Sequence, residues 1–114
     1  MRIRLRGLGI GTTPAIEEHV ERRLHFALGR FAGQLSEVVV RFEDVNGPRG
    51  GEDMACRFVA RLRSGVTVRI EERSRDLYSA VDRGADRLRH AVSREQARRH
   101  RRPSSVLRPA WSSA

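Results

Sequence analysis

Apolar and polar residues alternate along four short segments of the chain, a spacing typical of strands with one buried face. Ile3 and Leu5 alternate with arginines in the first segment. The apolar faces of the other three are Val38, Val40 and Phe42; Cys56, Phe58, Ala60 and Leu62; and Val66, Val68 and Ile70. The sequence therefore predicts one strand near the start and three consecutive strands in the middle.

Two longer segments repeat their apolar residues with the period of a helix. Thr13 followed by Pro14 is a typical helix start, and Gly33 is a plausible stop, so we expect a helix over about 14–32. Its apolar positions are Ile16, Val20, Leu24, Ala27, Leu28 and Phe31. A second helix is expected from a cap at Ser74 to about residue 98, with Pro103 ending its frayed last turns. Its apolar stripe is Leu77, Ala80, Val81, Gly84, Leu88, Ala91 and Val92.

The order of these segments is β-α-β-β-β-α, which predicts an α+β fold. A turn-rich loop at 46–51 and a tight two-residue turn at Ser64 and Gly65 join the last three strands. We expect a four-stranded, mainly antiparallel sheet with two helices packed on one face. Residues 1–100 would form one domain, and residues 101–114 a basic tail containing Ser and Pro that is disordered when free.

Composition narrows the class of protein. The 114 residues are 39% hydrophobic, enough for one small core, and the single Cys56 excludes an internal disulfide framework or a cysteine-based zinc site. No apolar run is long enough for a signal peptide or a membrane span. We expect a cytoplasmic protein that does not interact with membranes.

The charge balance points to a polyanionic partner. All 23 basic residues are arginine, against 14 acidic residues, which leaves a net charge of +9. Six arginines and one glutamate follow Ser93, so +5 of this charge falls in the last 22 residues. GC-rich coding is the more economical explanation for the absence of lysine.

The charges of the predicted second helix are segregated. With Leu77 at zero and about 100° per residue, most of its arginines fall at about 240–300°, and Asp82 and Asp86 fall at about 140–180°. The first helix repeats this asymmetry more weakly. Together the two basic flanks could form a positive surface or groove that binds RNA phosphates. The candidate RNA-binding residues are Arg22, Arg23, Arg30, Arg83, Arg87, His90, Arg94, Arg98 and Arg101.

No constellation predicts catalysis. The glycine-rich segment 7–11 lacks the third glycine of a dinucleotide-binding turn, because Thr12 stands there. Cys56 lies on the inward face of a strand, and the four histidines show no spacing for a metal or a catalytic triad. We therefore expect no enzyme activity, no cofactor, no metal and no small-molecule substrate. Tyr78 could stack on a base but is more readily placed against the rim of the sheet, and Trp111 could contact RNA or a protein groove.

Two motifs resemble a known family. The segment 13–16 with Val20 and Arg23-Leu24 is similar to the first-helix pattern of the ribosome hibernation-promoting factor and ribosome-associated inhibitor A family. The segment 76–82 resembles the second-helix signature of the same family. The resemblance covers about residues 1–100, in the same order of elements, and corresponds to the short, single-domain type.

The resemblance implies a specific function. Members of this family bind the small ribosomal subunit over its rRNA, where mRNA and tRNA would lie, and keep ribosomes inactive in stationary phase or stress. They use basic side chains of the helices, above all of the second one. In this chain Arg23, Arg87, His90, Arg94 and Arg98 fall at such positions.

Two other functions compete with ribosome binding. The chain could be a non-ribosomal regulator that docks on an acidic protein, or a diverged RNA-binding domain. The substitutions Arg87→Glu and Arg94→Glu distinguish these hypotheses, and because both residues lie off the apolar stripe we expect them to leave the fold intact.

Overall fold

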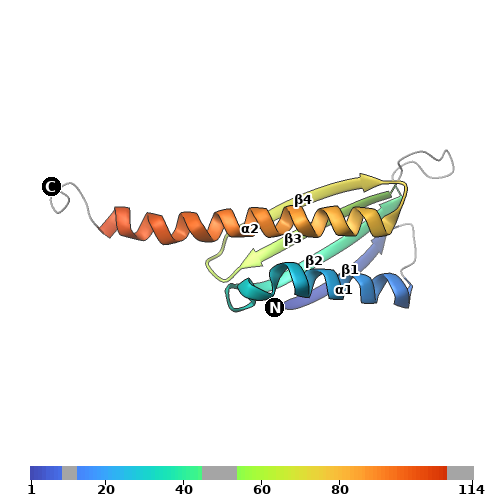
Figure 1. The fold of residues 1–114 in the computed structure, drawn as a ribbon, viewed down its shortest axis with the longest axis horizontal. Coiled ribbons are helices and arrows are strands. Elements are labelled where there is room, and N and C mark those ends of the chain that lie inside the picture. The colour runs from blue at the N-terminus through green and yellow to red at the C-terminus, as the bar shows by residue number, and fades with distance from the viewer. Residues whose placement is uncertain (9–12, 45–53, 108–114) are drawn as a thin grey trace.

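The computed structural model describes residues 1–8, 13–44 and 54–107, with side chains for all of these except Leu8 and 99–107. Four strands form one sheet in the order β1-β2-β3-β4, and both helices cover the same face of it (Figure 1). The α+β fold expected from the hydrophobic pattern is confirmed. The predicted loop at 46–51 lies outside the described residues, as do 108–114 of the predicted tail.

The sheet combines one parallel pair with two antiparallel pairs. Its strands are β1 (Arg2–Leu8), β2 (Leu35–Asp44), β3 (Met54–Leu62) and β4 (Thr67–Ser74). Strand β1 runs parallel to β2 because a helix connects them, whereas β2, β3 and β4 follow one another antiparallel.

Helix α1 (Pro14–Leu28) begins as the sequence predicts. The Thr13 hydroxyl accepts a hydrogen bond from the Ile16 amide at 3.2 Å, and Pro14 occupies the first helical position, where a missing amide costs nothing. The α-helix ends earlier than the predicted 14–32, and a 3-10 helix, η1 (Gly29–Gln34), follows it. Such tighter turns are common at helix ends, and this one still brings Phe31 into the core.

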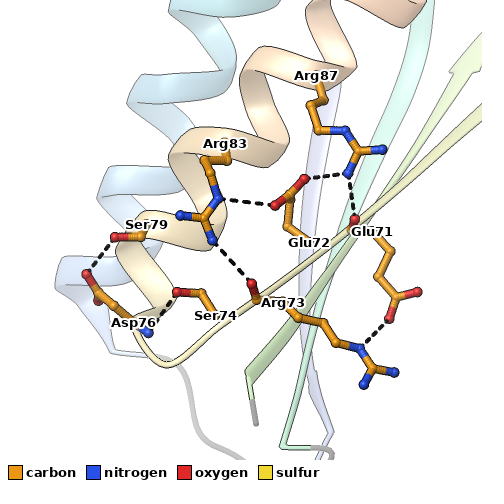
Figure 2. Close-up of polar contacts among 8 residues, drawn as sticks. All are labelled: Glu71, Glu72, Arg73, Ser74, Asp76, Ser79, Arg83 and Arg87. Atoms are coloured by element: carbon orange, nitrogen blue, oxygen red, sulfur yellow. Dashed lines mark hydrogen bonds and ion pairs between the residues drawn. The ribbon is translucent and has the colours of Figure 1, made fainter. Parts of the chain in front are cut away.

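Helix α2 (Leu77–Leu107) starts at a different cap from the predicted one. Ser74 is the last residue of β4, and its hydroxyl accepts from the Asp76 amide at 3.1 Å. Asp76 is the actual cap, because its carboxylate accepts from the Tyr78 amide at 3.1 Å. It also accepts from the Ser79 hydroxyl at 3.0 Å (Figure 2). Asp and Ser are both good cap residues, so local sequence alone could not choose between them.

The predicted end of the second helix is wrong. Helix α2 continues through Pro103 to Leu107, and its C-terminal part extends past the sheet (Figure 1). A proline inside a helix removes one amide donor and costs about 3 kcal/mol, but the turns on either side of it can remain helical. Proline therefore marks a weak point in a helix and not a compulsory end.

The connection between β3 and β4 is also one residue longer than predicted. The Leu62 amide donates to the Val66 carbonyl at 2.8 Å, which leaves Arg63, Ser64 and Gly65 as a three-residue loop. Gly65 has a φ of 101°, a left-handed conformation that favours glycine, and its amide donates to the Leu62 carbonyl at 2.9 Å.

The core lies between the sheet and the two helices. The predicted inward residues of β2, β3 and α1 are all buried, and Val66, Ile70, Ile3 and Leu5 pack partly buried at its margins. In α2 the structure adds Ala85 to the predicted buried stripe. Gly84 faces the Phe58 ring so closely that an added Cβ would lie 2.1 Å from it. Glycine at this position allows the helix to lie directly on the ring.

Candidate functional site

Two candidate arginines of α2, Arg83 and Arg87, are attached to the neighbouring strand β4 (Figure 2). Arg83 donates through Nε to the Glu72 carboxylate at 3.2 Å and through Nη2 to the Arg73 carbonyl at 3.2 Å. Arg87 donates through Nη1 to the same carboxylate and to the Glu71 carbonyl at 2.9 Å. Both guanidinium groups are thus held in place while about half of each side chain stays exposed.

Glu72 is the centre of this arrangement. Its side chain is only 13% exposed, and it points toward α2 from the inward-facing register of β4. Partial burial raises the pKa of Glu72, but hydrogen bonds and positive charge from Arg87 and Arg83 outweigh it, so the pKa lies below its ordinary value of 4.5. The carboxylate is therefore ionised at neutral pH and offsets one of the two positive charges.

This attachment changes the expectation for Arg87→Glu. Position 87 lies off the apolar stripe, as predicted, but a glutamate there would face the half-enclosed Glu72 carboxylate. Two carboxylates that face each other repel, and Arg83 alone would have to neutralise both. Charge reversal at Arg87 therefore tests the α2–β4 contact as well as any ligand, and Arg94 is the better probe of α2.

The opposite flank of α2 faces α1. Asp82 accepts from His19 Nε2 at 2.7 Å and lies 3.2 Å from Arg23 Nε, both residues of α1. The Tyr78 ring packs at 4.9 Å from the His19 ring, tilted by 59°. Tyr78 thus lies against His19 of α1, and Arg23 is partly neutralised.

The two basic flanks therefore do not adjoin to form one groove. The basic flank of α2 faces β4 through Arg83 and Arg87, and its acidic flank meets Arg23 of α1. Helical periodicity assigns each residue to a flank, but the packing of the helices decides which flank faces which neighbour. The structure places Arg83 and Arg87 in a cluster along β4 and the candidates of the first helix in a second cluster, and the other candidates lie farther along α2.

The cluster on α1 contains an aromatic residue that the sequence analysis missed. Arg22 and Arg30 are exposed, and between them on the helix surface lies Phe26, whose side chain is 81% exposed. The Arg23 guanidinium carbon lies 5.8 Å from the Phe26 ring centroid, within cation–π range. The sequence does indicate that Phe26 is exposed, because it falls at about 280° from Ile16, far from the apolar stripe of the helix.

The remaining candidates lie along α2 after Arg87, most of them in its second half. Arg94 is exposed and has no carboxylate partner among the described side chains, whereas Arg98 contacts Glu95 at 2.9 Å. His90 lies 3.8 Å from Asp86. Arg101 falls where the structure describes the backbone of α2 but no side chains. A shallow hollow of about 320 Å³ places Arg30 beside this half of the helix, next to Ser93, Gln96 and Ala97.

The described residues contain no cluster of metal ligands and no exposed thiol. Cys56 is buried, and burial, with a smaller contribution from Glu72, raises the pKa of its thiol to about 12. Such a thiol stays protonated and inert. Within 1–8, 13–44 and 54–107 no three His, Cys, Asp or Glu residues gather as metal ligands. No described helix is long and apolar enough to cross a bilayer.

This basic α+β domain is similar to one known protein family and to solved structures. Residues 3–100 match the family described as "Sigma 54 modulation protein / S30EA ribosomal protein". No curated protein matches significantly.

Two solved structures share the fold. The N-terminal domain of Protein Y from Thermus thermophilus is 33% identical, with a TM-score of 0.68, over 82% of this chain and 98% of that one. A ribosomal subunit interface protein from Coxiella burnetii is 25% identical, with a TM-score of 0.66, over 85% of this chain and 99% of that one. The family match covers all the strands and most of both helices, and with these two structures it confirms the resemblance noted in the two helical motifs: the chain belongs to the Sigma 54 modulation protein / S30EA ribosomal protein family, the family of the ribosome hibernation-promoting factors.

Proposed function

We propose that this chain is a ribosome-binding hibernation or stress factor that inhibits translation. The observation that carries the proposal is the family match over residues 3–100, because this family consists of ribosome-binding factors and not of enzymes. The relative from Coxiella burnetii is itself described as a ribosomal subunit interface protein. A ribosomal partner also implies that the chain acts in the cytoplasm.

The inhibition we propose is steric. The protein would occupy the mRNA and tRNA channel of the small ribosomal subunit and contact rRNA through the arginines of its helices. Arginine suits this task because its planar guanidinium can bind a phosphate through two hydrogen bonds. The net charge of +9 adds long-range attraction to rRNA, which would speed the encounter.

The geometry suggests different roles for the candidate residues. Arg22 and Arg94 are exposed and have no carboxylate partner among the described side chains, so binding a phosphate would not require them to break an ion pair. Arg83 and Arg87 are held by Glu72, which orients them for contact without further loss of side-chain freedom. Phe26 offers a ring on which an unpaired base could stack.

Co-sedimentation with purified ribosomes at 50 and 200 mM salt tests this proposal. If about six phosphates are neutralised, binding should fall about a thousandfold between these concentrations. The variant Arg22→Glu with Arg94→Glu should lose co-sedimentation at 50 mM salt, because both residues face solvent on the helices.

The matched control is Arg63→Glu with Arg75→Glu, which changes the net charge equally. Both residues are exposed. Arg63 lies in the hairpin loop, where its Nε donates to the Gly33 carbonyl at 2.9 Å, and Arg75 lies between β4 and α2. The control should sediment with ribosomes nearly as the parent does. Failure of the parent protein to co-sediment at 50 mM salt would overturn the proposal, and equal losses in both variants would overturn the assignment to the helical surface.

A further inference from the structure

The face of the sheet that the helices leave uncovered is rich in arginine. Alternate residues of each strand point away from the core, and six of them are arginines that line one shallow hollow of about 280 Å³. These residues are Arg4, Arg6, Arg41, Arg57, Arg61 and Arg69. Glu37 is the one acidic residue in this lining. We call this surface the open sheet face.

The strand register places three of these arginines directly beside one another. Arg6 of β1 pairs with Arg41 of β2, and Arg41 pairs with Arg57 of β3. Like charges directly opposite each other on neighbouring strands destabilise a sheet. The row continues into β4 with Glu71 opposite Arg57, so repulsion remains between Arg6 and Arg41. An anionic ligand is the more economical explanation for this pair of like charges.

Most of these arginines have no carboxylate partner. Arg57 contacts Glu43 at 2.9 Å and Glu71 at 3.5 Å, and Arg4 contacts Glu37 at 3.3 Å. The other four arginines of the hollow are exposed and form no ion pair with any described residue: Arg6, Arg41, Arg61 and Arg69. Their guanidinium groups are therefore available to an incoming anion without the loss of an existing contact.

The floor of the hollow distinguishes between classes of ligand. Val39 and Val59 form a cross-strand pair at its centre, and the longer arginine side chains surround them. Two valines are a poor anchor for a protein partner, because protein interfaces depend on buried aromatic or large apolar side chains. The lining also has no aromatic ring on which a base could stack.

Phosphate groups match the remaining features. Arginines two residues apart on a strand are separated by about 6.6 Å, and those on neighbouring strands by about 4.8 Å, so a chain of anions can contact several at once. Arginine binds phosphate through two hydrogen bonds, and neutralisation of phosphates alone supplies affinity without sequence preference.

We propose that the open sheet face is a second RNA-binding surface, which contacts the sugar–phosphate backbone independently of base sequence. It goes beyond the function proposed above, because it lies on the side of the sheet opposite the helices. A molecule with both surfaces can hold two RNA segments at once, one on each side.

The test uses a fluorescein-labelled poly(U) RNA of about 20 nucleotides and measures its anisotropy at 50 and 200 mM salt. The variant Arg41→Glu with Arg69→Glu should bind about tenfold more weakly at 50 mM salt. Its plot of log affinity against log salt should be flatter by about 1.4, because two phosphate contacts of about 0.7 each are lost. The control Arg63→Glu with Arg75→Glu carries the same net charge and should keep most of the affinity.

A second variant keeps the test valid if the charge reversal disturbs folding. Arg6→Gln with Arg41→Gln removes repulsion within the arginine row, so its melting temperature should stay equal or rise while poly(U) binding falls. If these arginines had only a structural role, the loss of poly(U) binding would be accompanied by a loss of stability.

Three outcomes would overturn the proposal. The first is unchanged poly(U) affinity in both sheet variants, and the second is an equal loss in the Arg63 and Arg75 control. The third comes from polyglutamate, measured as a second, acidic-peptide probe. Sheet variants that lose polyglutamate binding but keep poly(U) binding would indicate an acidic protein partner. Ribosome co-sedimentation of the parent and of the helical variant Arg22→Glu with Arg94→Glu tests the ribosomal function separately from the sheet variants. If the parent fails to sediment with ribosomes but the sheet variants lose poly(U), the ribosomal function fails and this proposal stands.

Discussion

At the scale of single residues, one glycine and one phenylalanine show how position in the fold gives a residue its role. Gly84 belongs to a helix, where glycine is normally unfavourable, yet here it allows α2 to lie on the Phe58 ring. Phe26 is a large apolar residue that lies almost fully in solvent, beside Arg23. In both cases the neighbouring side chain explains why this residue type occurs at this position.

We predict that Gly84→Ala destabilises the protein. The new methyl group would overlap the Phe58 ring, and the cost of such overpacking is about 1–3 kcal/mol, which exceeds the gain in helix propensity. The measurement is urea unfolding of the parent and the variant. The matched control is Gly29→Ala, where nothing lies within 4 Å and φ is −55°, so this variant should be as stable as the parent or more so. Equal stability of Gly84→Ala and the parent would show that the ring can move aside.

Phe26→Ala should weaken RNA binding without lowering stability. An exposed ring contributes little to the core, whereas stacking on a base contributes about 1–3 kcal/mol. Melting temperature and ribosome affinity, measured on the same variant, separate the two effects. Phe26→Trp should preserve binding because the larger ring also stacks. An unchanged ribosome affinity of Phe26→Ala would remove Phe26 from the proposed surface.

At the scale of elements, a single carboxylate connects α2 to the edge strand β4. Glu72 accepts hydrogen bonds from both Arg83 and Arg87, which are one turn apart on the helix. The contact fixes the rotation of α2 about its own axis, and with it the direction in which the other arginines of that helix point. The same helix is held on its other flank by the contact of Asp82 with α1.

The stability that Glu72 contributes should depend on pH. Because its pKa is lower in the folded protein than in the unfolded chain, this contribution is complete above the ordinary pKa of 4.5 and is lost as the pH falls through the folded value. Thermal unfolding of the parent and of Glu72→Gln at several pH values measures it. The parent should be the more stable above pH 4.5, and the difference should shrink below it.

Glu18→Gln, a change at an exposed carboxylate of α1, is the control for this experiment. It should alter the melting temperature little at any pH. A constant difference between the parent and Glu72→Gln across the whole range would contradict the ionic origin of the contact.

At the scale of the whole molecule, the positive charge lies on both sides of a thin two-layer domain. The helices carry one set of arginines, and the open sheet face carries another. The ribosome and poly(U) measurements therefore belong together, because each examines one side. If both proposals hold, a variant that combines the helical and sheet substitutions should bind RNA more weakly than the helical variant or the sheet variant alone. The reason is that the two sets of contacts are independent.

Much of this architecture could be predicted from local patterns. The alternation in β2 and β3 and the helical spacing in α1 identified their buried residues, because a strand and a helix repeat with fixed periods. The Thr13 and Pro14 signal located the start of α1, since both residues act within one turn. The errors concern choices between similar local signals: Ser74 or Asp76 as a cap, Pro103 as an end, and a turn of two or three residues.

The sequence by itself determined the class of fold, the sign of the charge and the arginines available to a partner. Only the tertiary structure decided which of them lie together. Asp82 faces Arg23, Glu72 holds Arg83 and Arg87, and Arg6 pairs with Arg41 because packing and strand register bring distant segments into contact. The physical reason is that periodicity acts within one element, whereas the relative rotation of two helices and the register of two strands depend on the core that they share.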